Sequence, residues 1–176
     1  MRLRAFYVIL LIMALVPVEA SKAQSEKTAM FVTAKADRVV VLKSERQMVL
    51  MRGDRVLRVY RVALGRYPKG HKVRKGDART PEGNYTIDYR VDSDRSNFYR
   101  SLHISYPNLR DRARASELGV HPGGQIMIHG LPTNWSANDV GHPTLDWTQG
   151  CIALTNREMD EIWEMVSVGT RIEIYP

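Results

Sequence analysis

Residues 38–64 read RVVVLKSERQMVLMRGDRVLRVYRVAL and carry the strongest structural signal in the chain. Three segments of this stretch are rich in β-branched and other strand-forming residues: 38–43, 47–52 and 55–64. The polar breaks between them, 44–46 and 53–54, have the lengths of tight hairpin connections. The pattern predicts a meander of three antiparallel strands.

The rest of the chain predicts more short strands and two helices. Strands are expected at 84–90, 101–106, 125–128 and 171–175, and helices at 109–118 and 156–166. The second helix starts behind Thr155 with a capping-box spacing to Glu158, and its apolar residues fall on one core-facing stripe: Met159, Ile162, Trp163 and Val166. We therefore expect a mainly β fold, a sandwich or a barrel-like sheet, with short helices and long loops.

The N-terminus has the organisation of a secretory signal peptide. Arg2 and Arg4 precede an uncharged, largely apolar run over residues 5–16, and small residues allow cleavage after Ala20 or after Ala23. The apolar run is shorter than the roughly 20 residues that span a bilayer, which makes an uncleaved membrane anchor the weaker alternative. We expect a signal peptide over 1–20, a short tether over 21–36 and one exported domain over 37–176, in the periplasm or the cell envelope.

Composition narrows the classes of function. The 176 residues carry a formal charge of +7, and removal of 1–20 takes away Arg2, Arg4 and Glu19 and leaves +6 on the exported part. The basic residues are spread along the chain without interleaved aromatic residues, so no nucleic-acid partner is expected and an anionic envelope polymer fits better. The single cysteine, Cys151, excludes an intrachain disulfide and is either a buried apolar residue or a reactive thiol.

Two segments hold more turn-forming residues than a simple connection needs. Residues 65–83 read GRYPKGHKVRKGDARTPEG, and residues 130–150 read GLPTNWSANDVGHPTLDWTQG. Long ordered loops on a β scaffold are common places for binding and catalysis. We expect the functional site to be built from these two segments.

A histidine and the cysteine stand at the ends of the second loop. His129 and Gly130 follow a predicted strand, and Gly150 precedes Cys151. A histidine within reach of a thiol can remove its proton and create a nucleophilic thiolate, while backbone N–H groups near Gly150 can stabilise an oxyanion. These residue types predict a cysteine acyl-transfer site, with an inert buried cysteine as the open alternative.

A zinc site is the other chemical alternative. Its ligands would come from His121, His129, His142 and Cys151, with Asp146 nearby. The spacings of these residues match no standard zinc motif, so neither a metal nor another cofactor is expected.

Three ordered motifs resemble the catalytic domain of the L,D-transpeptidases, the YkuD type. They are Ile128-His129-Gly130, the run TQGCIALTN at 148–156 and the run VGTRIEI at 168–174, preceded by KGDARTPEGNY at 75–85. The resemblance covers about residues 37–176. It implies a β-rich fold in which the cysteine lies on a loop facing the histidine.

The resemblance also implies an activity. Cys151 would attack the carbonyl of the third residue of a peptidoglycan stem peptide, expel the terminal D-amino acid and form a thioester. His129 would act as the base, oriented by the backbone carbonyl of Gly130, and would later activate an acceptor amine. The acceptor would be a second stem peptide, which gives a 3→3 cross-link, or a lysine of an outer-membrane lipoprotein. No cofactor is implied.

Two positions depart from the family pattern. Gln149 stands where a second histidine is expected, and Ala153 where an arginine or asparagine is expected. Residues 146–151 resemble a subgroup with members that cleave bonds to peptidoglycan, so a hydrolase or amidase is an alternative, and a non-catalytic wall-binding domain is a second one. Lys75, Arg79, Trp147 and Gln149 are the expected substrate-binding residues.

Overall fold

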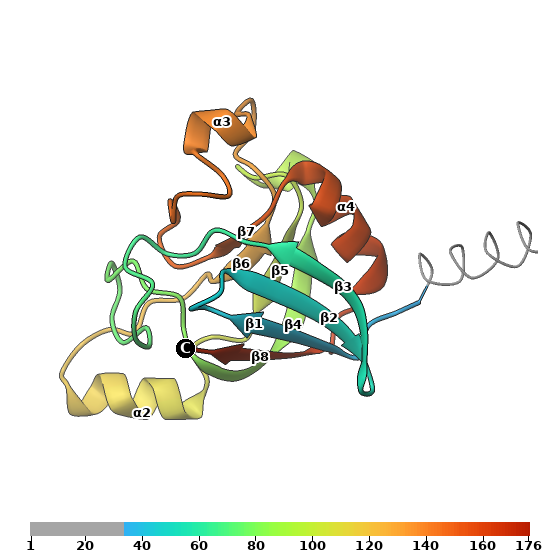
Figure 1. Cartoon of the computed structure of the whole chain (residues 1–176). Coiled ribbons are helices and arrows are strands. Elements are labelled where there is room, and N and C mark those ends of the chain that lie inside the picture. The colour runs from blue at the N-terminus through green and yellow to red at the C-terminus, as the bar shows by residue number, and fades with distance from the viewer. Residues whose placement is uncertain (1–33) are drawn as a thin grey trace, which may run out of the picture.

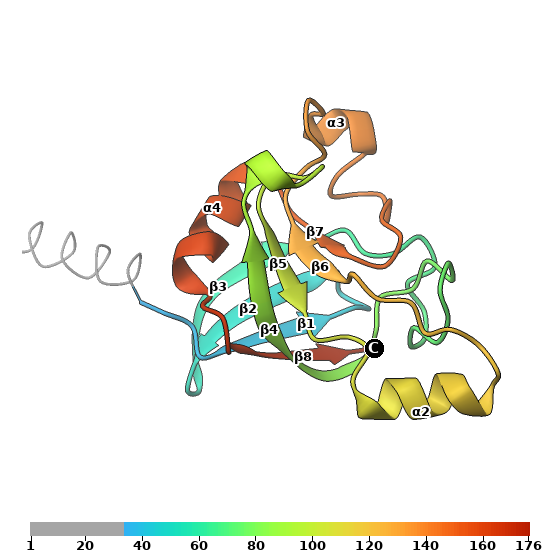
Figure 2. The same ribbon diagram turned by 180° about the vertical axis from the view of Figure 1, so that it is seen from behind.

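The computed structural model describes residues 34–176 (Figures 1 and 2). The expected signal peptide and nearly all of the expected tether lie outside the described residues. One eight-stranded sheet has the order β3-β2-β1-β8-β4-β5-β6-β7. Its strands are β1 (Arg38–Leu42), β2 (Gln47–Arg52), β3 (Arg55–Arg61), β4 (Gly83–Val91), β5 (Ser101–Ile104), β6 (Met127–His129), β7 (Ile152–Ala153) and β8 (Arg171–Tyr175).

The expected N-terminal meander is confirmed. β1 pairs antiparallel with β2, and β2 pairs antiparallel with β3. Gly53 turns the second hairpin with a φ of 56°, a conformation that glycine adopts without a steric penalty. Alternate residues of these strands, such as Val39, Val41 and Met48, are fully buried, which is why the apolar pattern specifies the pairing.

The C-terminal strand lies in the middle of the sheet. β8 runs parallel to β1 on one side and antiparallel to β4 on the other. Ile172 and Ile174 bury their side chains in the same core as the meander. The strand was expected from the sequence, but its long-range parallel partner was not, because a period-two pattern identifies a strand and not its neighbour.

The two outer strands of the sheet approach each other. Ala63, just beyond β3, exchanges two backbone hydrogen bonds with Ala153 of β7, with N–O distances of 3.0 and 2.8 Å. The sheet therefore curls into a barrel-like shape, as expected from the sequence (Figure 2).

Short helices surround this sheet. They are the 3₁₀ turn η1 (Ser93–Arg95), α2 (Leu109–Glu117), α3 (Ala137–Val140) and α4 (Asn156–Met165). α4 packs on the sheet through Met159, Ile162 and Met165, and the capping box between Thr155 and Glu158 is confirmed. No helix of residues 34–176 is long and apolar enough to cross a membrane.

Four details differ from the sequence expectation. Trp163 is only partly buried, because it packs beneath Arg90, whose guanidinium carbon lies 3.7 Å from the ring centroid. η1, α3 and β7 were not expected, since two to four residues are too few to show a periodic pattern.

Candidate active site

The pairing of β6 with β7 brings the candidate histidine and cysteine together. Ile128 pairs with Ile152, and His129 pairs with Ala153, in parallel register. Because successive side chains point to opposite faces, Ile128 and Ile152 enter the core while His129 and Cys151 share the other face. The two residues are diagonal neighbours, and strand spacing and rise place their Cα atoms roughly 8 Å apart.

His129 is buried and held by its own chain. Only 1% of the residue is exposed, and Nδ1 lies 2.6 Å from the carbonyl oxygen of Gly130. A carbonyl only accepts, so Nδ1 carries the proton and Nε2 keeps its lone pair for base chemistry. Burial lowers the pKa of His129 to about 4, although the Gly130 carbonyl favours the charged form, and His142 lowers the pKa further. At neutral pH the imidazole is therefore an uncharged base.

Two aromatic rings cover His129. The ring centroid of Phe98 lies 4.0 Å from that of the imidazole at an interplanar angle of 34°, and Trp147 meets the imidazole edge-on at 5.8 Å. Gly130 itself packs closely against two other residues, since a Cβ there would lie 2.7 Å from Asn156 Oδ1 and 2.8 Å from the Tyr99 carbonyl. The aromatic cover keeps water away from the base and fixes its orientation.

Cys151 is partly exposed, and its thiol is protonated at rest. Sγ donates to the carbonyl oxygen of Gln125 over 3.6 Å. Burial raises the pKa of the Cys151 thiol, while the Met127 backbone N–H and the charge of Lys72 act in the opposite direction. No hydrogen bond joins Sγ to His129 among residues 34–176, so the thiol would have to rotate to reach the imidazole.

A short hydrogen-bonded turn presents Cys151. The hydroxyl of Thr148 donates to the Cys151 carbonyl over 2.8 Å and accepts from the Gly150 N–H over 3.0 Å. Gly150 has a φ of 128°, and a Cβ there would lie 2.5 Å from the carbonyl oxygen of Arg79. Only glycine fits this position.

The backbone N–H groups of Gly130 and Gly150 are both hydrogen-bonded within the protein. The Gly150 N–H is bound by Thr148, and the Gly130 N–H donates to the Tyr99 carbonyl over 2.8 Å. Neither is free to meet a ligand oxygen. Gly130 contributes its carbonyl, which binds His129 Nδ1. Gly150 allows its loop to pack closely against the Arg79 carbonyl.

An aspartate clamp holds the segment before Trp147. The carboxylate of Asp146 accepts from Arg46 Nη2 over 2.8 Å and from Arg46 Nε and the Leu64 backbone N–H, each over 3.0 Å. This contact joins the meander to the loop that covers His129. The sequence carries no local signal for it, because 100 residues separate the two charged partners.

A second network supports Gln125. A register shift after Ile87 places both Asp88 and Tyr89 beside His103. His103 Nδ1 lies 2.6 Å from Asp88 Oδ1, and the Tyr89 ring stacks on the imidazole at 4.3 Å. Tyr89 also donates from its hydroxyl to Gln125 Oε1 over 3.2 Å. These residues were not expected at the site. The sequence indicated only that His103 lies on a predicted strand.

The two long loops lie side by side and line two pockets. Gly65 pairs with Thr148, which brings residues 65–83 against the segment that leads to Cys151 (Figure 1). The aromatic pocket, about 880 Å³, lies beside His129 and is lined mainly by residues of the second loop. Trp147 lines it, as expected, and so do Phe98 and Trp135.

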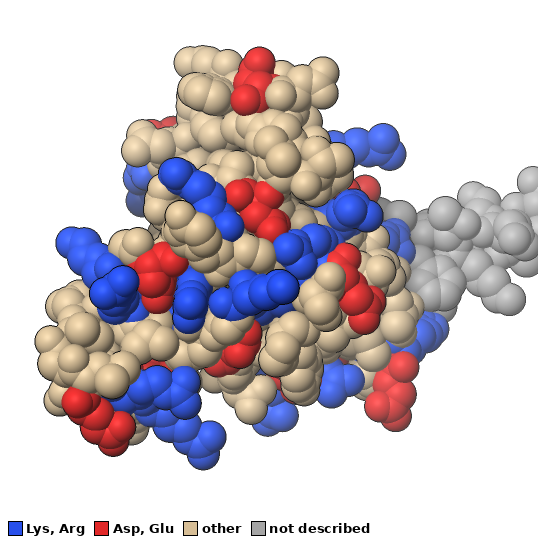
Figure 3. All heavy atoms as spheres, turned by 60° about the vertical axis from the view of Figure 1, so that its left-hand side comes forward, with Lys and Arg blue, Asp and Glu red and all other residues tan. Residues whose placement is uncertain are grey.

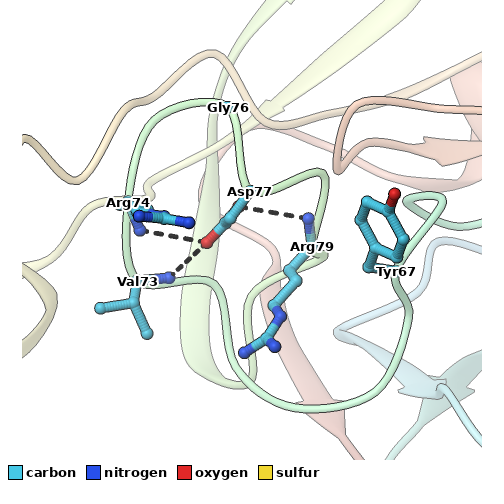
Figure 4. Close-up of a pocket in the computed structure, with 6 residues that line it drawn as sticks. All are labelled: Tyr67, Val73, Arg74, Gly76, Asp77 and Arg79. Atoms are coloured by element: carbon cyan, nitrogen blue, oxygen red, sulfur yellow. Dashed lines mark hydrogen bonds between the residues drawn. The ribbon is translucent and has the colours of Figure 1, made fainter.

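The arginine pocket, about 490 Å³, lies within the first loop (Figure 4). It is lined by Tyr67, Val73, Arg74, Gly76, Asp77 and Arg79. Arg79 was expected at the site, whereas Arg74 was missed among the many basic residues of this loop. Lys75 is exposed and does not line the pocket.

The remaining candidates are not part of these pockets. Gln149 is exposed, whereas Ala153 is fully buried in β7. His121 is exposed, and within residues 34–176 no three His, Cys, Asp or Glu side chains are arranged to hold a metal ion, which leaves the zinc alternative without support. Lys and Arg side chains spread over the face shown in Figure 3, with acidic side chains between them.

Comparisons with known proteins identify the family and the fold. The L,D-transpeptidase catalytic domain (YkuD) matches residues 36–174. YafK of Escherichia coli strain K12, whose name places it among the L,D-transpeptidases, is 31% identical over 114 residues, which are 61% of this chain and 39% of YafK. The chain thus matches well under half of the length of that relative.

Solved structures share the fold. The helical cell shape determining protein Pgp2 from Campylobacter jejuni superposes with a TM-score of 0.58 at 22% identity, over 78% of this chain and 46% of Pgp2. An L,D-transpeptidase from Xylanimonas cellulosilytica gives a TM-score of 0.52 at 19% identity, over 81% of this chain and 61% of that one. The expected mainly β, L,D-transpeptidase-like fold is confirmed, and this chain belongs to the L,D-transpeptidase catalytic domain family.

Proposed function

We propose that the chain is a peptidoglycan acyl-transfer enzyme with Cys151 as nucleophile and His129 as base. The observation that carries the proposal is the shared sheet face of these two residues, with His129 fixed by the Gly130 carbonyl so that Nε2 is unprotonated. A neutral base beside a protonated thiol is the resting state that a cysteine acyl transfer needs. Family membership supports the same reaction class.

The first half-reaction cleaves an amide of the stem peptide. His129 Nε2 takes the Sγ proton, and the sulfur attacks the carbonyl carbon after the third residue. The C–N bond then breaks, the leaving amine takes the proton from the imidazolium, and a thioester remains on Cys151. The Cys151 N–H is the oxyanion donor that we propose, since the N–H groups of Gly130 and Gly150 are already bound.

The second half-reaction releases the thioester. An acceptor amine attacks the thioester carbonyl, His129 removes the amine proton, and sulfur leaves and takes that proton back. Burial disfavours the imidazolium form of His129, so the charged pair is short-lived and resting thiolate does not accumulate. This order of events protects the single thiol from adventitious oxidation.

The acceptor determines the biological role. An amine of a second stem peptide gives a 3→3 cross-link, a lysine of an outer-membrane lipoprotein gives an attached protein, and water gives hydrolysis. The exposed Gln149 and the buried Ala153 remove the two polar side chains that the family pattern puts beside the nucleophile, so we keep hydrolase or amidase activity as the alternative outcome. Since Pgp2 determines helical cell shape, a role in cell shape is part of the proposal.

Mass spectrometry of the intact protein tests the mechanism. Incubation with purified tetrapeptide muropeptides should give a covalent adduct that Cys151→Ala abolishes, while the exposed His121→Ala serves as a matched control that keeps it. An adduct that persists in Cys151→Ala would overturn the assignment. A protein that binds sacculi equally well with and without Cys151 and never turns over would instead be a non-catalytic wall-binding domain.

Product analysis separates the remaining alternatives. Cross-linked or lysine-linked peptide identifies a transferase, and released stem peptide identifies a hydrolase. We also propose export through a cleaved signal peptide, and N-terminal sequencing of the mature protein should find a start at Ser21 or Gln24.

A further inference from the structure

The arginine pocket is built on a fully bonded aspartate. Asp77 accepts from the backbone N–H groups of Val73, Arg74 and Arg79 (Figure 4). It also accepts from Lys72 Nζ over 2.7 Å. Partial burial alone would raise the pKa of Asp77, but these hydrogen bonds outweigh it and the pKa lies below its usual value. The carboxylate is thus fixed in its charged form and its acceptor capacity is filled.

Two guanidinium groups in the same pocket have no such partner. Among residues 34–176, the side chains of Arg74 and Arg79 form no ion pair and no hydrogen bond. In Figure 4 the Arg79 side chain extends across the ring formed by the loop, and Tyr67 borders it with 67% of its surface exposed. The pocket therefore offers unpaired cationic donors beside an aromatic wall.

The base of the loop is anchored rather than free. Lys43 is 2% exposed and donates to the carbonyls of Gly70 and Thr80 over 2.8 and 3.0 Å and to Glu82 Oε1 over 2.7 Å. Burial lowers the pKa of Lys43, and the nearby positive charge of Arg79 lowers it further. A rigid loop that holds unpaired cations beside a buried lysine attracts an anion.

The arginine pocket adjoins the residue that precedes the nucleophile. The Arg79 carbonyl packs against Gly150, the residue before Cys151. Phe98 and Trp147, which line the aromatic pocket, instead contact the ring of His129. Because His129 protonates the leaving amine and deprotonates the acceptor amine, both amines belong on the aromatic side. The acyl part of the peptide then extends toward the arginine pocket.

We propose that Arg74 and Arg79 bind a free carboxylate of the acyl-donor peptide. The inference rests on the proposed acyl transfer for the direction in which the peptide lies. It rests on the unpaired guanidinium groups for the kind of group that is bound. A guanidinium forms paired, charge-assisted hydrogen bonds with a carboxylate, and a carboxamide of the same shape lacks the charge. The pocket thus selects peptides whose side-chain or α-carboxylates are not amidated.

Binding to an inactive protein tests the proposal apart from catalysis. In a Cys151→Ala background, a tetrapeptide muropeptide with free carboxylates should bind about tenfold more tightly than a counterpart in which only the carboxylates of the acyl part are amidated. Arg79→Gln and Arg74→Gln should each reduce that preference, the double variant should remove it, and 0.5 M salt should weaken it. Arg61→Gln is the matched control, since Arg61 is exposed on β3 outside both pockets.

The outcomes distinguish this inference from the proposed function. Equal binding of the two peptides, with normal adduct formation by the unmodified enzyme, overturns the carboxylate site and leaves acyl transfer intact. A carboxylate preference that the two arginines carry, without any adduct, supports the site and overturns the acyl transfer. A preference that persists in the double variant overturns the assignment to Arg74 and Arg79.

Discussion

The Cys151 thiol donates to the main-chain carbonyl of Gln125 across 3.6 Å, and this contact sets the resting state of the site. Gln125 has a φ of 55°, which a residue with a Cβ adopts at a cost of about 1 kcal/mol. The turn that aims this carbonyl at sulfur is therefore held by its surroundings, including Tyr89. A carbonyl that accepts from S–H stabilises the protonated thiol and not the thiolate.

The first prediction concerns the titration of Cys151. Because burial raises the pKa of its thiol, the rate of alkylation by iodoacetamide should rise with pH to a midpoint above the value of about 8.5 for an unperturbed cysteine. The chain has no second cysteine, so the modified mass reports this site alone. A midpoint below pH 7 would show that a thiolate–imidazolium pair exists at rest.

The second prediction concerns His129 and acid. With a folded-state pKa of about 4, the base stays neutral, and the acid limb of the rate profile assigned to His129 should lie near pH 4 rather than near 6.5. His129→Ala should lower kcat by at least about 100-fold. If the limb of the wild-type enzyme lies at pH 6.5, the imidazole is not desolvated as described.

The same pKa predicts how stability depends on pH. The unfolded histidine binds a proton below about pH 6.5 and the folded one only below about 4, so between these values the unfolded state holds more protons. Stability contributed by His129 is therefore complete above pH 6.5 and falls by up to about 3 kcal/mol as the pH drops to 4. Urea unfolding at several pH values measures the slope, and His129→Gln should flatten it.

The third prediction concerns Gly150. Gly150→Ala places a Cβ 2.5 Å from the Arg79 carbonyl at a φ of 128°, and should cost at least about 2 kcal/mol of unfolding free energy and most of the activity. Gly169→Ala is the control, since its φ of 89° is also left-handed but nothing lies within 4 Å of the new Cβ. Similar losses of melting temperature in both variants would mean that backbone strain, and not the contact with Arg79, is the reason why position 150 requires glycine.

The fourth prediction concerns the aspartate clamp. Asp146→Ala leaves the Leu64 N–H and the Arg46 guanidinium without their acceptor and frees the segment that carries Trp147. Stability should fall by about 1 to 3 kcal/mol, and activity should fall further than stability alone explains. Asp94→Ala, at an exposed carboxylate that lines neither pocket, should change neither property.

The sequence predicted the parts of the fold that local patterns encode. Alternation fixed the three N-terminal strands, and the capping residue Thr155 fixed the start of α4. The pairing of β8 with β1 and the Ala63–Ala153 contact involve residues far apart in the chain, which no local period reports. A barrel-like sheet was expected from the sequence, but the residues that pair where the sheet closes were not.

The candidate site likewise has residues that the sequence identified and residues that it did not. His129 and Cys151 could be selected from residue chemistry and ordered motifs, and the register of β6 and β7 then explains why they meet. Arg74 and Gln125 were missed, and the clamp role of Asp146 was not foreseen, because nothing in their neighbours along the chain indicates these contacts. Their roles depend on partners from other segments, such as Arg46 and Tyr89.

The last prediction returns to the Gln125 carbonyl through Tyr89. Tyr89→Phe removes the hydroxyl that donates to Gln125 Oε1 and should loosen the turn without unfolding the protein, since Tyr89 is 38% exposed. A carbonyl aimed less well at sulfur stabilises the neutral thiol less, so the pKa of Cys151 should fall and alkylation at pH 7 should accelerate about two- to threefold. Tyr175→Phe is the matched control, because that exposed tyrosine donates to Glu173 of its own strand, β8, and not to a residue of the site. Equal alkylation rates in wild type and Tyr89→Phe would mean that Tyr89 only packs on His103 and does not help to position the nucleophile.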